Sequence, residues 1–283
     1  MVTVGVVWAA ATLSACGEEQ PNDEGFTGGE GSSAMVTLQK VADTTGQQQS
    51  AKVKGSITQD TPRGEQETTM DGAMDWSQGG MLAEMSTVQS GGQVSGSPID
   101  GLPTPTRYLA DAYYVNLGGG FASTAGQGAH WVKYDYGRLA EKLGPAGAFL
   151  KDQMQNNNPS RSVELLLATG EATEVGTETV DGQSTTHYRG SFKVADLADM
   201  QSQELSNAEL QGLKDQLEAN GMETETIDLW VNSDNLLVKK VESAESSQGM
   251  NIESTVHYSD YGTSVTVEAP DAADTIDFEQ VQG

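Results

Sequence analysis

The sequence predicts an α+β domain in which a large antiparallel β-sheet carries its helices on one face. Three observations lead to this fold class. Many runs alternate apolar and polar residues with period two, as half-buried strands do. An Asp-Gly pair joins two of these runs, which is typical of a hairpin between antiparallel strands. The helical patterns form separate blocks instead of alternating one by one with the strands, and this favours an antiparallel sheet.

A first helix is predicted over residues 34 to 46, where Leu38, Val41 and Ala42 share one helical face and Gly46 can end it. Further helical pieces are expected between Gly137 and Gly170.

The helix with the clearest signals runs from Asn207 to Asn220. Ser206 and Glu209 form a capping box before it, and Gly221 follows as the residue that ends it. We expect its apolar stripe to pack against the core.

The predicted strands lie on both sides of these helical blocks. They cover residues 53–57, 70–76, 81–88, 108–117, 130–136, 173–180, 183–194, 227–231, 236–242, 251–258 and 264–269. Asp181 and Gly182 join two of them as a type I′ turn. Residues 91–106 contain three prolines among glycines and serines, so no regular element is expected there. The glycine-rich residues 118–128 are expected to form a flexible hairpin tip.

The amino terminus carries an export pattern. Residues 2 to 11 are mostly apolar and too few to span a bilayer as a helix, but they suit the apolar region of a signal peptide. The next residues, Leu13-Ser14-Ala15-Cys16, resemble the lipobox of bacterial lipoproteins. This resemblance implies cleavage before Cys16 and attachment of lipid to its thiol. The first basic residue is Lys40, so we expect the natural start to lie a few codons upstream.

The expected organisation has three parts. Residues 1–15 are the signal peptide, residues 16–33 are a flexible tether, and residues 34–283 are the folded domain. Residues 17 to 33 contain five acidic residues, no basic residue and one aromatic residue, so they bury too little apolar surface to fold alone. Two acyl chains on one cysteine anchor a protein stably. We therefore expect an extracytoplasmic protein held at the cell membrane.

Composition limits the possible functions. The chain has 283 residues, of which 36% are hydrophobic, enough for a sizeable core. Its formal charge is −26, which repels nucleic acids and anionic membrane surfaces at long range. The single cysteine leaves no internal disulfide.

No motif of a catalytic site occurs in the sequence. It contains no Gly-x-Ser-x-Gly elbow, no Walker loop, no Gly-x-Gly-x-x-Gly turn and no EF-hand calcium loop. The three histidines, His130, His187 and His257, have no second metal ligand nearby in the sequence, so we expect surface or packed side chains. The protein is therefore expected to be noncatalytic, to use no cofactor or metal, and to be a monomer.

Several segments together resemble the LolA-like lipoproteins of actinobacteria, of the LppX and LprG type. They are the lipobox, the helix before the first strand, the helical block, Val180 to Gly190, Ile227 to Asn232, and Tyr258 to Gly262 followed by Val265 to Pro270. The resemblance covers roughly residues 34 to 278 and carries no catalytic motif. It implies that the sheet is a strongly curved half-barrel around helices, with an apolar cavity that holds acyl chains in some members.

The candidate ligand-binding residues are apolar side chains of the predicted strands. Alternation places Met70, Met74 and Trp76 on one face of their strand, and it places Met81 and Met85 on one face of the next. Methionine suits surfaces that accept variable apolar ligands, although these side chains could also simply fill the core. Further candidates are Leu109, Tyr114 and Trp131.

Two functions follow from these expectations. The first is a membrane-anchored, noncatalytic lipoprotein that binds or carries a lipid or another apolar small molecule between sheet and helices. The second is a structural or regulatory envelope protein whose interior is filled by its own side chains and which acts through protein contacts. A cavity lined by apolar atoms would favour the first function.

Overall fold

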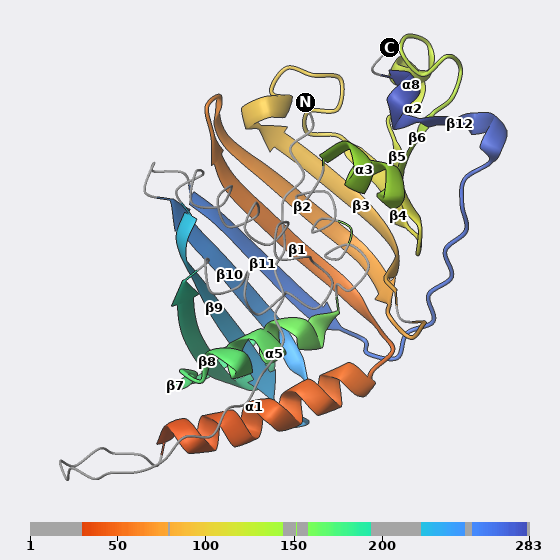
Figure 1. The fold of residues 1–283 in the computed structure, drawn as a ribbon. Helices are drawn as coiled ribbons and strands as arrows, with labels where there is room; N and C mark the ends of the chain where they lie inside the picture. Colours follow the sequence, from red (N-terminus) through yellow and green to blue (C-terminus); the bar gives the residue numbers. More distant parts are fainter. Residues whose placement is uncertain are drawn as a thin grey trace.

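The fold is a single strongly curved sheet with helices on its inner face (Figure 1). The computed structural model describes residues 30–78, 80–143, 151, 158–193, 222–246 and 251–281. Within these ranges, twelve strands form one sheet in the order β12-β6-β5-β4-β3-β2-β1-β11-β10-β9-β8-β7. Neighbouring strands are antiparallel, except that β12 runs parallel to β6. The expected α+β class is confirmed.

The strands are long in the middle of the sheet and short at one edge. They are β1 Ser50–Thr61, β2 Gly64–Asp75, β3 Leu82–Gly91, β4 Pro103–Tyr108, β5 Ala112–Asn116, β6 Trp131–Asp135, β7 Thr173–Val180, β8 Gln183–Lys193, β9 Met222–Asn232, β10 Leu237–Ser246, β11 Asn251–Ser259 and β12 Thr275–Asp277. The helices are α1 Glu30–Gln47, α2 Gly118–Ala122, α3 Tyr136–Leu143, α5 Pro159–Thr169 and α8 Phe278–Val281, with the 3-10 turns η1 Gly92–Val94 and η2 Ala272–Asp274.

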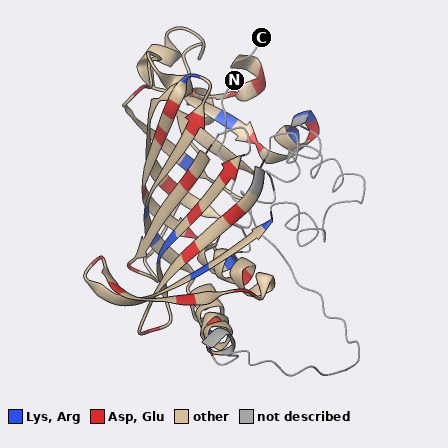
Figure 2. Cartoon of the chain, turned by 90° about the vertical axis from the view of Figure 1, so that its left-hand side faces the viewer, with Lys and Arg blue, Asp and Glu red and all other residues tan. Residues whose placement is uncertain are grey.

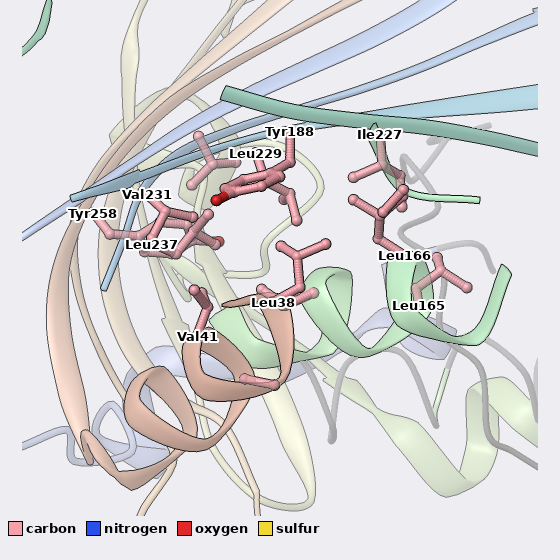
Figure 3. Packing of buried hydrophobic residues seen from close by; sticks show 14 of the residues in the cluster. Leu38, Val41, Leu165, Leu166, Tyr188, Ile227, Leu229, Val231, Leu237 and Tyr258 are labelled. Atoms are coloured by element: carbon pink, nitrogen blue, oxygen red, sulfur yellow. The ribbon is translucent and has the colours of Figure 1, made fainter. Parts of the chain in front are cut away.

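The core lies where α1 and α5 cover one end of the inner face (Figures 1 and 3). Leu38 and Val41 of α1 and Leu166 of α5 are fully buried against the strands. The local sequence of α5 accounts for its bounds, because Asn158 caps the Arg161 amide and Gly170 ends the helix in the left-handed conformation.

Glycines in strand interiors allow very close approach of neighbouring backbones. A Cβ atom at Gly72 of β2 would lie 2.2 Å from the Glu84 carbonyl oxygen, and one at Gly55 of β1 would lie 2.7 Å from the Thr255 carbonyl oxygen. Interior glycines of this kind mark bends and close contacts in sheets. They belong to the part of the sheet where β11, β1, β2 and β3 are neighbours.

The loop expected over residues 91–106 is partly wrong, because β4 begins at Pro103. Pro103 and Pro105 pair with Val88 and Ser86 of β3, whereas β5 pairs with β4 only from Thr106 onward. Proline has no backbone N–H to donate, so it is tolerated in a strand where one side has no neighbouring strand to bond. The two prolines therefore occupy a locally free edge.

Three other expectations need correction. The strand expected over residues 108–117 is broken at 109–111 between β4 and β5. The tip expected at 118–128 contains α2. Residues 264–269 are not a strand, although they lie near the sheet, since Arg107 Nη1 donates a hydrogen bond to the Glu268 carbonyl oxygen. A strand needs a partner ladder, and that segment has none among the described residues.

The first helix was expected from residue 34, but α1 begins at Glu30, so residues 30–33 of the expected tether are helical. The other predicted elements agree with the structure or lie outside the described residues. The Asp181-Gly182 hairpin is confirmed, and both residues have the positive φ of a type I′ turn. Cys16 and the predicted helix over residues 207–220 lie outside the described residues. Among the helices that are described, none is both long enough and apolar enough to cross a bilayer.

Candidate functional site

The inner face beyond the core carries both apolar and polar side chains. They lie in rows of residues that are paired across neighbouring strands. One row runs across four strands through Lys240, Val256, Gly55 and Met70. The next row runs through Glu242, Ser254, Ile57 and Thr68. Ile57, Thr68 and Met70 are half-buried, while Lys240, Glu242 and Ser254 are buried. This part of the sheet therefore presents an amphipathic surface toward the inside of the half-barrel.

The predicted methionine group lies on the inner face. Met74 and Met81 are each 3% exposed and belong to the core, while Trp76 and Met85 are partly buried against it. Met70 is half-buried. On the inner face of β2, Gly72 lies between Met70 and Met74 and pairs with Met85 of β3. The structure thus brings Met70, Met74 and Met85 together.

Leu109, Tyr114 and Trp131 form a separate cluster with Ala112. Tyr113 pairs with Tyr108, which packs against the main core, so alternation places Tyr114 on the outer face of the sheet. The Arg107 guanidinium lies 5.0 Å from the centre of the Trp131 ring. These three candidates therefore lie apart from the methionine group. Ligand contact by any of the eight candidate residues stays a prediction.

A buried polar cluster lies on the inner face between β10 and α5. Lys240 Nζ donates hydrogen bonds to both carboxylate oxygens of Glu242, each at 3.0 Å, and to Ser162 Oγ at 2.9 Å. Ser162 Oγ donates in turn to Glu242 Oε1 at 2.6 Å. The three protons of the ammonium group are thereby used, and the charges of Lys240 and Glu242 compensate each other.

Glu225 of β9 lies beside this cluster, where the charges of Glu242 and Lys240 both act on its carboxyl group. It is 2% exposed, and its Oε2 atom accepts and donates no hydrogen bond within the part of the chain that the structure describes. Burial, together with the nearby Glu242 carboxylate, raises the pKa of Glu225 well above its ordinary value, although Lys240 opposes the shift. The alternation of Glu225 with Ile227 and Leu229 was the sequence signal for an inward carboxyl group, and the candidate residues did not include it.

Stacked aromatic rings extend the interior toward the short-strand edge. Tyr113 stacks on Tyr134 with ring centres 4.6 Å apart, and Tyr134 stacks on Phe278 of α8 at 5.6 Å. Tyr108 stacks on the other side of Tyr113 at 5.9 Å, and burial raises the pKa of Tyr108 to about 12. These rings join the core to the carboxyl-terminal elements.

The three histidines are each paired with a carboxylate. His130 Nδ1 lies 2.6 Å from Asp274 Oδ1, and His257 Nδ1 lies 2.6 Å from Asp181 Oδ2. His187 is paired with Asp228 through Nε2 and stacks on Trp230 with ring centres 4.3 Å apart. Among the described residues, no group of His, Cys, Asp and Glu side chains is arranged to hold a metal ion.

Acidic residues are spread over the strands and loops on the side of the molecule shown in Figure 2, with basic residues interspersed among them. Several form exposed ion pairs, such as Lys52 with Asp260 at 2.7 Å and Lys54 with Asp71 at 3.4 Å. Exposed pairs of this kind contribute little to stability. The excess of negative surface charge therefore serves mainly to keep the protein soluble.

Comparison with known sequences finds two relatives from Streptomyces. An uncharacterized 31.2 kDa protein of Streptomyces griseus, from the rplA-rplJ intergenic region, is 39% identical over 254 residues, which is 88% of this chain and 80% of the relative. A Streptomyces coelicolor protein named "Putative lipoprotein SCO4650" is 32% identical over 304 aligned positions, covering 99% of this chain and 95% of the relative. No protein-family model matches the chain.

Comparison with solved structures finds two mycobacterial proteins. LprF of Mycobacterium bovis has a TM-score of 0.49 and 18% identity, covering 86% of this chain and 99% of its own. Lipoprotein LppX of Mycobacterium tuberculosis has a TM-score of 0.49 and 15% identity, covering 84% of this chain and 99% of its own.

Proposed function

Because this chain belongs to the family of the Streptomyces coelicolor protein named "Putative lipoprotein SCO4650", we propose that it is a lipid-anchored envelope protein that binds an acyl lipid on its inner face. The membership agrees with the expected resemblance to actinobacterial lipoproteins. The proposed anchor is Cys16, and the proposed binding surface is the half-buried part of the inner face around Met70 and Met85. No catalytic role is proposed.

The observation that carries this proposal is the continuation of the apolar inner face beyond the core. Met74 is buried in the core, whereas Met70, beyond Gly72 on the same face of β2, is half-buried, as are Met85 and Ile57. Hydrophobic surface that remains half-buried next to a packed core is suited to an apolar ligand. Each methylene group of an acyl chain buried there would contribute about 0.8 kcal/mol.

Two neighbouring residues of β2 provide a matched test of the binding surface. Met70 faces inward, and Thr69 is exposed on the opposite face of the same strand. We expect lipid extracted from natively purified wild-type protein to be detectable by mass spectrometry. We expect Met70→Asp to weaken binding of a fluorescent fatty acid at least about tenfold, because a carboxylate would face the apolar chain. Thr69→Asp should bind as the wild type does.

The outcome also separates the two functions expected from the sequence. If the wild type carries no lipid and binds no fluorescent fatty acid, the carrier proposal is wrong, and a structural or regulatory protein acting through protein contacts replaces it. Equal loss of binding in Met70→Asp and Thr69→Asp would contradict the inner face as the binding surface.

The anchor is tested independently of the ligand. In the native host, wild-type protein should incorporate labelled palmitate and sediment with membranes, while Cys16→Ser should do neither, because the thiol is the site of lipid attachment. A Ser14→Ala variant is the control, since it keeps a small residue before the cysteine. Membrane retention of Cys16→Ser would contradict the anchor.

A further inference from the structure

We propose that Glu225 is the polar contact of the ligand site and that it hydrogen-bonds to an uncharged oxygen-bearing head group of the bound lipid, such as a hydroxyl or an ester. This inference rests on the proposed function, and it adds the class of head group and the residue that recognises it.

The position of Glu225 follows from the register of the sheet. Glu225 pairs with Phe192 of β8 and with Ala244 of β10, and Phe192, like Ile227 and Leu229, belongs to the core. Its side chain therefore extends from the inner face, among apolar neighbours. Glu225 lies four strand spacings from β2, about 19 Å across the sheet, and two inward positions from the row that contains Lys240 and Met70. An acyl lipid lying along this face can reach both the methionines and the polar cluster.

The Oε2 atom of Glu225 is buried and has no hydrogen-bond partner in the part of the chain that the structure describes. A buried polar atom without a hydrogen bond is destabilising, so natural proteins rarely leave one unless another molecule completes it. Lys240 cannot supply the bond, because its three protons are already donated to Glu242 and Ser162. A ligand oxygen on the inner face would complete the hydrogen bonding of Glu225.

The surroundings indicate an uncharged head group. The positive charge of Lys240 is compensated by Glu242, and Phe192 and Ala244 offer no donor from their side chains to a phosphate. An anionic head group would therefore lie beside a carboxylate and a carboxyl group, and the one described cation of this cluster, Lys240, is already compensated, which is unfavourable in a buried site. A protonated carboxyl group can donate to an ester or hydroxyl oxygen and accept from a hydroxyl group.

The test compares two fluorescent lipids with identical acyl chains, dioleoylglycerol and dioleoyl phosphatidic acid, each labelled on one chain. The full-length protein is titrated as wild type, Glu225→Gln and Glu225→Leu, with Glu253→Leu as a control that removes an exposed carboxylate from the outer face. We expect the wild type and Glu253→Leu to bind dioleoylglycerol at least about tenfold more tightly than phosphatidic acid.

The variants distinguish recognition from a structural role. Glu225→Gln should retain the preference, because an amide still donates and accepts, while Glu225→Leu should lose about tenfold in affinity for dioleoylglycerol with little change for phosphatidic acid. Glu225→Leu should also melt at a temperature no lower than that of the wild type, since it removes an unpartnered buried group. The fold of Glu225→Leu is checked by circular dichroism. If this variant does not fold, the wild-type titration still tests the inference, because equal wild-type affinity for the two lipids contradicts it.

Failure of this inference differs from failure of the proposed function. If the wild type binds neither lipid, the proposed function is wrong. If it binds both equally, or if Glu225→Leu keeps the preference, lipid binding stands and the role of Glu225 is overturned.

Discussion

At the scale of single residues, Glu225 is the clearest exception to the sequence pattern, because an ionisable side chain occupies a position where the alternation of β9 calls for an apolar one. It occupies an inward position of a strand whose other inward residues, Ile227 and Leu229, are fully buried and apolar. An apolar residue there would avoid the desolvation of a carboxyl group. Such conflicts between pattern and residue type are expected at functional positions.

Glu225 should make the stability of the protein depend on pH. Because the pKa of Glu225 is raised in the folded state, the folded protein binds this proton more tightly than the unfolded chain. Its contribution to stability is complete below about pH 4.5, the ordinary value, and is lost as pH rises toward the folded pKa, by up to about 1.4 kcal/mol per pH unit.

Urea unfolding at several pH values tests this linkage. Glu225→Gln cannot ionise, so its free energy of unfolding should match that of the wild type near pH 4 and exceed it increasingly up to pH 7. Glu253→Gln, on the outer face, should follow the wild type throughout. A constant difference between wild type and Glu225→Gln would show that Glu225 does not ionise over this range.

At the scale of elements, the sequence predicts those that depend on local chemistry. The β7–β8 hairpin is confirmed because Asp181 and Gly182 prefer the positive φ that its turn requires. Strand β4 was not predicted because Pro103 and Pro105 argue against a strand, and β12 was not predicted because it is short and its partner β6 is distant in sequence. Pro103 is tolerated by a locally free edge, and Thr275 to Asp277 pair with β6.

The candidate site was predictable to a similar extent. Period-two alternation correctly placed Met70 and Met74 on one face. The same rule cannot say which face of a strand is the inner one, so it grouped Tyr114 and Trp131 with them although they lie on the outer face. The polar cluster requires contacts between β10 and α5, which no local pattern reports.

Replacing Gly72 should weaken the pairing of β2 with β3. The Cβ atom of Gly72→Ala would lie 2.2 Å from a backbone oxygen of β3, so the strands must separate. We expect a loss of about 3 kcal/mol in the free energy of unfolding, measured in urea. Gly120→Ala is the control, because Gly120 of α2 is exposed and has no atom within 4 Å of the added carbon. Equal effects of the two substitutions would contradict this account.

At the scale of the whole molecule, the tyrosines report how much of the fold lies away from water. The chain contains eight tyrosines, and burial raises the pKa of each of them above its ordinary value. They lie on β4, β5, β6, β8, β11 and their flanks, so they sample most of the sheet.

Alkaline titration should therefore unfold the protein cooperatively. A tyrosine with a raised folded pKa stabilises the fold below the ordinary value near pH 10, and that contribution is lost as pH rises further. We expect little tyrosinate absorbance at pH 10, followed by a single steep rise that coincides with loss of the circular dichroism signal. A chain unfolded in urea, as the control, should titrate near pH 10. Gradual ionisation of the folded protein near pH 10 would contradict burial of these rings.

The two ends of the sheet have a consequence for behaviour in concentrated solution. At one end, β7 is exposed, carries Glu174 and Glu178, and is interrupted by an irregularity in pairing before Gly176. At the other end, β12 offers only three residues. Charges, bulges and short edges prevent strand addition by a second polypeptide. The protein should therefore resist fibril formation, and replacing Glu174 and Glu178 with valine should make it prone to assemble through β7.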